Sequence, residues 1–162
     1  MSELCSNAMD DGDFDTIMEN SCPTTVHKFQ WIVKDLTQYP KSYAVSPCFY
    51  PLPEKSCNLE LGKINEWIEG KTSSPYLMME LHWGESYFIK SNTSLCDSNY
   101  KVLFEHSITN EVYHNTSKVY LGGFGDSQDL LQKLRETGTD TLIIRCRMEI
   151  SHPEKKINKK LL

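Results

Sequence analysis

The sequence predicts an all-β protein, an antiparallel β-sandwich of two sheets with about eight strands and one short helix before the last strand. Three observations indicate this fold class. Residues 140–150 alternate between apolar and polar side chains, short runs of strand-forming residues recur between turn residues, and apolar residues take helical spacing in the body only within residues 126–134. Short strands joined by turns favour antiparallel pairing over a parallel α/β sheet.

Residues 140–150 form the stretch around which we expect the fold to be organised. Its apolar members fall at every second position, and they are Leu142, Ile144, Cys146, Met148 and Ile150. Arg145 and Arg147 stand between them, on the opposite side of an extended chain. This pattern predicts a long strand with one face in the core and the other in water.

The remaining strands are expected wherever apolar alternation or β-branched and aromatic residues recur between turn signals. These runs are residues 26–36, 42–49, 57–64, 76–83, 86–89, 100–108 and 112–120. The first run places Trp31 on one face with Phe29 and Val33, so we expect Trp31 in the core. Residues 65–75 and 92–99 are polar and are predicted as connections.

The chain is expected to form one domain with a tail at each end. Residues 1–23 are acidic and nearly lack aromatic side chains, which predicts a disordered tail. Residues 24–150 form the domain, and residues 151–162 form a basic C-terminal tail or the start of a linker. The charge is uneven, because residues 1–27 carry −6 and the remainder carries +1.

Composition narrows the range of partners and compartments. A body close to neutral lacks the basic footprint that nucleic acid requires, and the apolar runs are too short to span a membrane. The six cysteines show no CxxC spacing, and no signal peptide is recognisable at the N-terminus. We therefore expect an intracellular protein, nuclear or cytoplasmic, with free thiols.

Catalytic and metal-binding patterns are not found in the sequence. The five histidines show neither HExxH nor CxxC-like spacing, and GxSxG and P-loop arrangements are missing. We expect no enzymatic activity, no metal and no cofactor.

Four stretches, in this order and spacing, resemble a MATH domain. They are residues 29–36, residues 76–79, residues 102–108, and Gly123-Phe124 ahead of residues 142–150. The likeness covers about residues 24–150 and is closest to the MATH module of speckle-type POZ adaptor proteins. The resemblance implies a TRAF-like sandwich of eight strands, in which a shallow aromatic groove on one sheet holds a short extended Ser/Thr-rich peptide.

The resemblance also implies candidate peptide-binding residues. Phe104, Gly123 and Phe124 match groove positions, whereas Glu80 stands where the family has a tyrosine and Gly122 where it has a tryptophan. Tyr120 is a candidate replacement aromatic residue. A carboxylate at Glu80 favours basic side chains in the ligand. For Phe104 and Phe124, packing in the core is the alternative, and an anchor role requires partial exposure.

The expected function is therefore a protein-interaction module that binds short extended peptides of client proteins, Ser/Thr-rich or basic. The resemblance implies recruitment to a cullin-type ubiquitin ligase through a BTB domain, which would be expected beyond Leu162 and is absent from this chain. The alternatives are a structural or oligomerising TRAF-like domain without a ligase role, or a MATH-only remnant with a degenerate groove.

Overall fold

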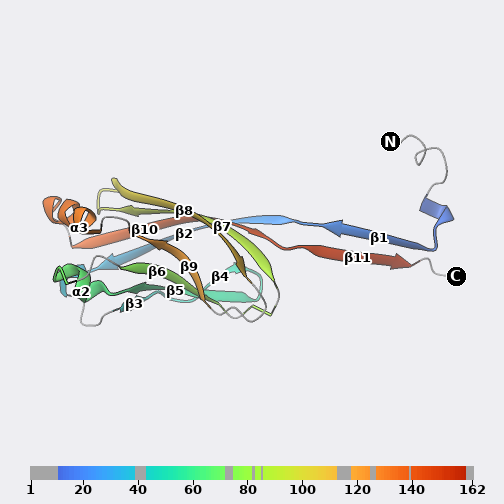
Figure 1. Cartoon of the computed structure of the whole chain (residues 1–162), viewed down its shortest axis with the longest axis horizontal. Coiled ribbons are helices and arrows are strands. Elements are labelled where there is room, and N and C mark those ends of the chain that lie inside the picture. The colour runs from blue at the N-terminus through green and yellow to red at the C-terminus, as the bar shows by residue number, and fades with distance from the viewer. Residues whose placement is uncertain are drawn as a thin grey trace.

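A computed structural model describes residues 11–38, 43–71, 75–81, 83–84, 86–112, 118–124, 127–138 and 140–159. Two layers of strands form the body, and a narrow two-stranded ribbon projects from one end (Figure 1). Every strand pair in the described residues is antiparallel. The predicted antiparallel two-sheet sandwich is confirmed, although the described residues contain eleven strands, more than the eight or so expected.

One layer is a four-stranded sheet with the order β2-β10-β7-β8. Its strands are β2 (Thr24–Lys34), β10 (Thr141–Ser151), β7 (Tyr87–Cys96) and β8 (Val102–Val112). The other layer is a five-stranded sheet with the order β3-β5-β6-β9, in which β4 also pairs with β5. Its strands are β3 (Tyr43–Val45), β4 (Phe49–Leu52), β5 (Lys55–Gly62), β6 (Tyr76–Leu81) and β9 (Lys118–Gly123).

The strand predicted at residues 140–150 is β10, and it lies inside its sheet between β2 and β7. All five of its alternating apolar side chains are buried, while Arg145 and Arg147 are exposed. Two neighbouring ladders satisfy its backbone groups, so a strand with one solvated face is stable in this position. Both the strand and its inward face were correctly predicted.

The sequence misplaced the boundaries around β7. Residues 86–89 were expected as a short strand and residues 92–99 as a polar loop, yet β7 continues to Cys96. Ser91 and Thr93 are buried on its inward face, and β8 and β10 pair with it on both sides. Cross-strand pairing on two edges outweighs the weak strand propensity of these polar residues.

Two helices close the end of the sandwich opposite the ribbon (Figure 1). α3 (Ser127–Glu136) is the predicted helix before β10, and it buries Leu130, Leu131 and Leu134. α2 (Ile64–Ile68) lies in the stretch predicted as a connection, where it buries Ile64 and Trp67. A helix of only five residues gives no clear periodic signal, and its apolar contacts hold it in place.

Residues 16–21, predicted as part of a disordered tail, form a strand of the ribbon, and so do residues 154–159 of the segment predicted as a basic tail or the start of a linker. β1 (Thr16–Ser21) pairs with β11 (Glu154–Lys159), and the ladder continues the register of β2 and β10 without a shift. Glu19 is paired in register with residue 156. Disorder was predicted for residues 1–23 because this acidic segment alone buries little apolar area. Composition cannot reveal that the segment pairs with a distant strand. The tail residues 1–10 and 160–162 lie outside the described residues.

The core fills the space between the two sheets, and Trp67 and Trp83 are among its largest fully buried side chains. Trp31, expected in the core, is only half-buried against it. β2 is an edge strand, so within its own sheet its inward side chains have a neighbouring strand on one side only.

Candidate functional site

The candidate site is the solvated face of the five-stranded sheet, where apolar and aromatic side chains gather. We name it the tyrosine face, and it comprises Tyr43 and Val45 of β3, Tyr76 and Met78 of β6, and Tyr120 of β9. Val45 is 47% exposed, Tyr43 45% and Tyr120 40%. Aromatic residues that remain this accessible on a sheet face are the residue types that anchor peptide ligands.

Strand pairing places these residues in two rows across the sheet. Tyr43, Gly62, Tyr76 and Gly123 form one row, and Val45, Glu60, Met78 and Tyr120 form the next. A β-bulge between Leu77 and Met78 sets the second row, since it lets Tyr120 pair with Met78. Residues that are directly opposite in antiparallel strands share a face, so the rows form one continuous surface.

Glycines on either side of Tyr76 let tyrosine rings lie flat on the backbone. A Cβ atom at Gly62 would collide with the Tyr76 ring, and a Cβ atom at Gly123 would collide with the Tyr120 hydroxyl. Neither glycine has a positive φ, so close approach of the tyrosines is what requires glycine here. The Tyr76 ring and the Tyr120 hydroxyl therefore lie close to the sheet backbone.

Tyr76 is oriented by a carboxylate on the neighbouring strand. Its hydroxyl donates a hydrogen bond of 3.2 Å to Glu60 Oε2. Burial, followed by the charge of Glu60 and the hydrogen bond itself, raises the pKa of Tyr76 above its ordinary value. The phenol therefore stays neutral and remains a donor at physiological pH.

A third row adds charge at one side of the tyrosine face. It contains Asn58, Glu80 and Lys118, which lie opposite one another on β5, β6 and β9. With Glu60, the face carries two carboxylates among its aromatic groups. Such a surface suits an extended chain with apolar side chains and a basic or hydrogen-bonding side chain.

The structure divides the six predicted site residues into two groups. Glu80, Tyr120 and Gly123 belong to the rows of the tyrosine face. Phe104, Gly122 and Phe124 line the seam between β8 and β9 together with His106, and Gly123 also borders this seam. The space among the seam residues is too narrow for a water molecule.

Phe124 is a core residue, and the partial exposure required of an anchor is not observed. Its side chain is 3% exposed, and its ring contacts those of Trp67 at 6.1 Å and Phe104 at 6.2 Å between centroids, both edge to face. The alternative of core packing thus describes Phe124. Phe104 is half-buried on β8 and stacks on His106 at 6.3 Å.

Gly122 occupies a position that a large side chain would not fit. A Cβ atom there would stand 3.0 Å from His106 Cδ2, and the residue is buried beside Leu77. A tryptophan at this position would have to displace His106. This chain therefore places its aromatic groups elsewhere, on Tyr76 and Tyr120.

Sequence reasoning missed Tyr43, Val45, Tyr76 and Met78 as members of the face. The signal was available for β6, because its alternation assigns Leu77, Met79 and Leu81 to the core and hence the residues between them to solvent. No comparable signal exists for Tyr43, since its place depends on pairing with Gly62.

Compared with known proteins, the chain matches no family model and no curated protein. In the described part of the chain, no group of three or more His, Cys, Asp or Glu side chains is arranged to hold a metal ion. Of the helices formed by described residues, none has the length and apolar character needed to cross a membrane.

Proposed function

We propose that this chain is a protein-interaction module that binds a short extended peptide of a client protein on the tyrosine face. The observation that carries the proposal is the half-exposed surface of Tyr43, Val45, Met78 and Tyr120 on the outer face of the five-stranded sheet. Monomeric proteins rarely leave contiguous apolar surface on a sheet face without a binding role. The resemblance to MATH domains points to the same class of function.

The charges on the face define the preferred ligand. Glu60 and Glu80 favour a peptide that carries a basic side chain beside small hydroxyl-bearing or apolar ones. An acidic or phosphorylated peptide would meet two carboxylates and bind poorly.

A screen of the full chain against short Ser/Thr-rich, basic and acidic peptides tests this proposal. Tyr120→Ala should weaken capture of the best peptide by about 1 to 3 kcal/mol, because truncation of an aromatic anchor removes most of its contact area. Glu80→Gln should reduce the preference for basic over acidic peptides, with Glu136→Gln on α3 as the matched control. Unchanged capture by Tyr120→Ala, with an unchanged melt, would place binding off this face.

We further propose that capture serves to recruit the client to a cullin-type ubiquitin ligase, as in the adaptors that the sequence resembles. The test is the half-life in cells of a reporter fused to the best peptide. Expression of the chain should change that half-life only when cullin ligases are active, and Tyr120→Ala should abolish the change. A half-life that does not depend on cullin activity rejects the ligase role and leaves peptide binding intact.

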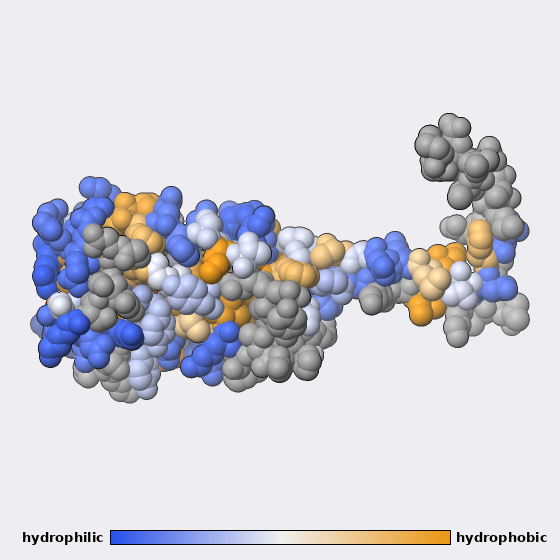
Figure 2. All heavy atoms as spheres, viewed as in Figure 1, coloured by the Kyte–Doolittle hydropathy of each residue, from blue (hydrophilic) through white to orange (hydrophobic). Residues whose placement is uncertain are grey.

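One feature favours the alternative of an oligomerising domain. The ribbon exposes Met18 and Ile157 side by side, at 76% and 65%. Figure 2 shows hydrophobic residues at the surface of the projecting ribbon. If the ribbon forms an oligomer, the parent chain should sediment as a dimer or larger species at micromolar concentration, and Met18→Lys with Ile157→Lys should yield monomers. A monomeric parent chain excludes this alternative.

A further inference from the structure

The free edge of β2 lies in the other sheet from the tyrosine face. In the described residues β2 pairs only with β10, so along its other edge every second residue turns its backbone N–H and C=O groups away from the sheet. Open strand edges of this kind accept an additional strand from another chain. β2 is eleven residues long, which is ample for such pairing.

The inner side of this edge opens onto an apolar cavity. A space of about 210 Å³ lies between β2 and the segment joining β3 to β4. Its lining includes His27, Phe29, Trp31, Pro47 and Phe49. Phe49 contacts Phe29 at 5.2 Å and stacks on His27 at 5.7 Å between ring centroids. These rings are only half-buried, so a further apolar side chain could complete their burial.

On the outer face of the same sheet, a basic hollow of about 440 Å³ begins at β2 and extends over β10 to β7. Its polar lining includes Lys28, Gln30, Asn92, Ser94, Arg145 and Arg147. Gln30 Oε1 accepts a hydrogen bond of 2.8 Å from Arg145 Nε, and the Arg145 guanidinium lies 4.4 Å from the Tyr100 ring centroid. Both partners are neutral, so the Arg145 charge is positioned without being neutralised by them.

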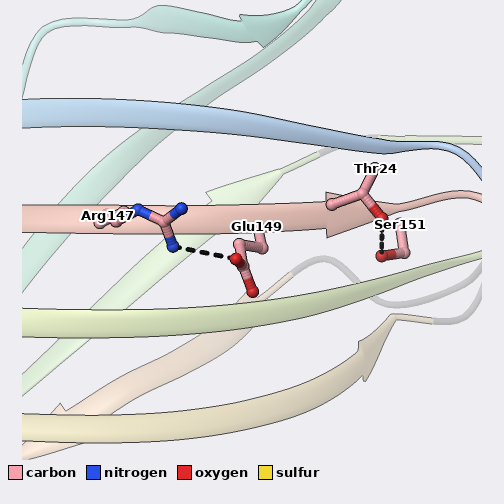
Figure 3. A network of polar contacts seen from close by, with 4 residues as sticks. All are labelled: Thr24, Arg147, Glu149 and Ser151. Atoms are coloured by element: carbon pink, nitrogen blue, oxygen red, sulfur yellow. Dashed lines mark hydrogen bonds and ion pairs between the residues drawn. The ribbon is translucent and has the colours of Figure 1, made fainter.

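Only one carboxylate stands among the outward side chains of β2 and β10. It is Glu149, whose Oε1 lies 3.0 Å from Arg147 Nη1 on the same strand (Figure 3). The cations at these outward positions are Lys28, Lys34, Arg145 and Arg147. The outward surface beside the edge is therefore positive.

We propose that β2 receives, by strand addition, an extended segment of a partner protein in which acidic and apolar residues alternate. Successive side chains of an added strand point to opposite faces of the sheet. One set would enter the apolar cavity beside Phe29 and Trp31, and the other would reach Lys28 and Arg145. The two cavities share Phe29 and Gln30 in their linings, so neighbouring residues of one segment would occupy both.

This site is distinct from the tyrosine face and has the opposite charge preference. The free edge, the two cavities and the charge complementarity support this site independently of the proposed function. The chain also carries acidic and apolar residues in its own N-terminal segment, including Asp15, Ile17 and Glu19, so a second copy is the competing occupant that an experiment must separate.

The test is titration calorimetry of the full chain with a synthetic peptide that alternates glutamate with phenylalanine and valine. A peptide of equal composition with its acidic and apolar residues grouped should bind at least about tenfold more weakly, and one with lysine in place of glutamate should not bind. Trp31 reports on the apolar cavity, because Trp67 and Trp83 are buried. Its emission should shift to the blue on binding, and Trp31→Phe should abolish the shift.

Backbone pairing is tested by N-methylation of the peptide at alternate amides. One alternating set of methyl groups faces β2 and should abolish binding, while the other faces solvent and should leave it nearly unchanged. Equal binding by both sets would overturn strand addition.

The charge contact is tested by Lys28→Glu combined with Arg145→Glu, with Lys71→Glu combined with Lys133→Glu as the matched control on exposed surface elsewhere. The first double variant should bind the glutamate peptide at least about tenfold more weakly than the parent chain and should bind the lysine peptide. A misfolded variant would not bind the lysine peptide. Equal binding of alternating and grouped peptides, or indifference to the charge reversal, overturns the proposal. So does a chain that sediments as a dimer and takes up no peptide, because its own N-terminal segment would then be the occupant.

Discussion

At the scale of single residues, the difference between a groove residue and a core residue depends on strand register. Phe124 and Tyr120 are four residues apart, and a sequence pattern gives both the appearance of ligand anchors. The bulge between Leu77 and Met78 directs Tyr120 to solvent, while Phe124, just beyond the end of β9, turns into the core beside Trp67. Substitution of Phe124 should therefore lower the stability of the fold, whereas substitution of Tyr120 should mainly weaken ligand binding.

Phe124→Ala should lower the free energy of unfolding by about 3 to 5 kcal/mol, since it removes a ring from a packed core and leaves a cavity. Tyr120→Ala should lower it by less than about 1 kcal/mol, because exposed positions contribute little. Urea melts of both variants measure the difference. Equal midpoints for Phe124→Ala and the parent chain would contradict the buried position.

The buried thiols make stability dependent on alkaline pH. Burial raises the pKa of Cys57 to about 12 and that of Cys146 to about 11, whereas an unfolded thiol titrates near about 8.5. Above that pH the unfolded chain loses thiol protons that the folded chain keeps, so the thiols' contribution to stability is complete below about pH 8.5 and falls as pH rises toward 11 to 12. Denaturant melts from pH 7 to 11 should show this decline.

Cys57→Ala combined with Cys146→Ala provides the control for this pH dependence. The double variant should decline less steeply than the parent chain, because, among the described residues, only Cys96 remains as a buried thiol whose pKa burial raises. Parallel curves for both proteins would show that the thiols titrate alike in the folded and unfolded chains.

At the scale of elements, the ribbon differs from every other part of the sheet system. β1 is exposed along its whole length, and a two-stranded sheet with neither face covered is marginally stable in water. β2 and β10 form the same continuous ladder, but they are anchored by the core and by β7. Stability should therefore fall sharply where the ladder leaves the body.

Backbone amide exchange should show this gradient directly. Amides of β1 and β11 should exchange much faster than the paired amides of β2 and β10, because local opening of the ribbon exposes no core. Comparable protection along the whole ladder would indicate that the ribbon is covered in solution by another molecule.

A chain that spans residues 24–151 should fold and melt within a few degrees of the full chain. It loses the ribbon but none of the buried residues of the core. Thermal melts followed by circular dichroism provide the measurement. A large drop in midpoint would mean that the ribbon or the segments beyond it pack against the body.

At the scale of the whole molecule, the two proposed binding surfaces of the sandwich have opposite charge preferences. The tyrosine face lies on the outer side of the five-stranded sheet and carries Glu60 and Glu80. The β2 edge belongs to the four-stranded sheet and carries Lys28 and Arg145. The packed core between the sheets separates the two surfaces, so a ligand on one need not disturb the other.

We therefore expect independent binding at the two surfaces. Saturation with the best ligand of the tyrosine face should leave the affinity for the alternating acidic peptide unchanged within about twofold, since the two surfaces belong to different sheets separated by the packed core. Competition titrations measure this directly. Mutual exclusion of the two ligands would show that one surface serves both.

Local pattern was sufficient to predict the fold class and the central strand. Strict alternation in residues 140–150 specifies which side chains face the core whatever the partners are, because the period of two is a property of the extended backbone. The stripe of Leu130, Leu131 and Leu134 likewise predicted α3. Both signals are contained within a few consecutive residues.

The ribbon and both proposed binding surfaces depend instead on pairing between distant segments. The ribbon requires residues 16–21 to meet residues 154–159, and the tyrosine face requires β3, β6 and β9 to align around Gly62 and Gly123. The apolar cavity requires β2 to lie beside the segment that precedes β4. These contacts join residues far apart in the chain, and their register is set by the packing of the complete core, so no short stretch of sequence contains them.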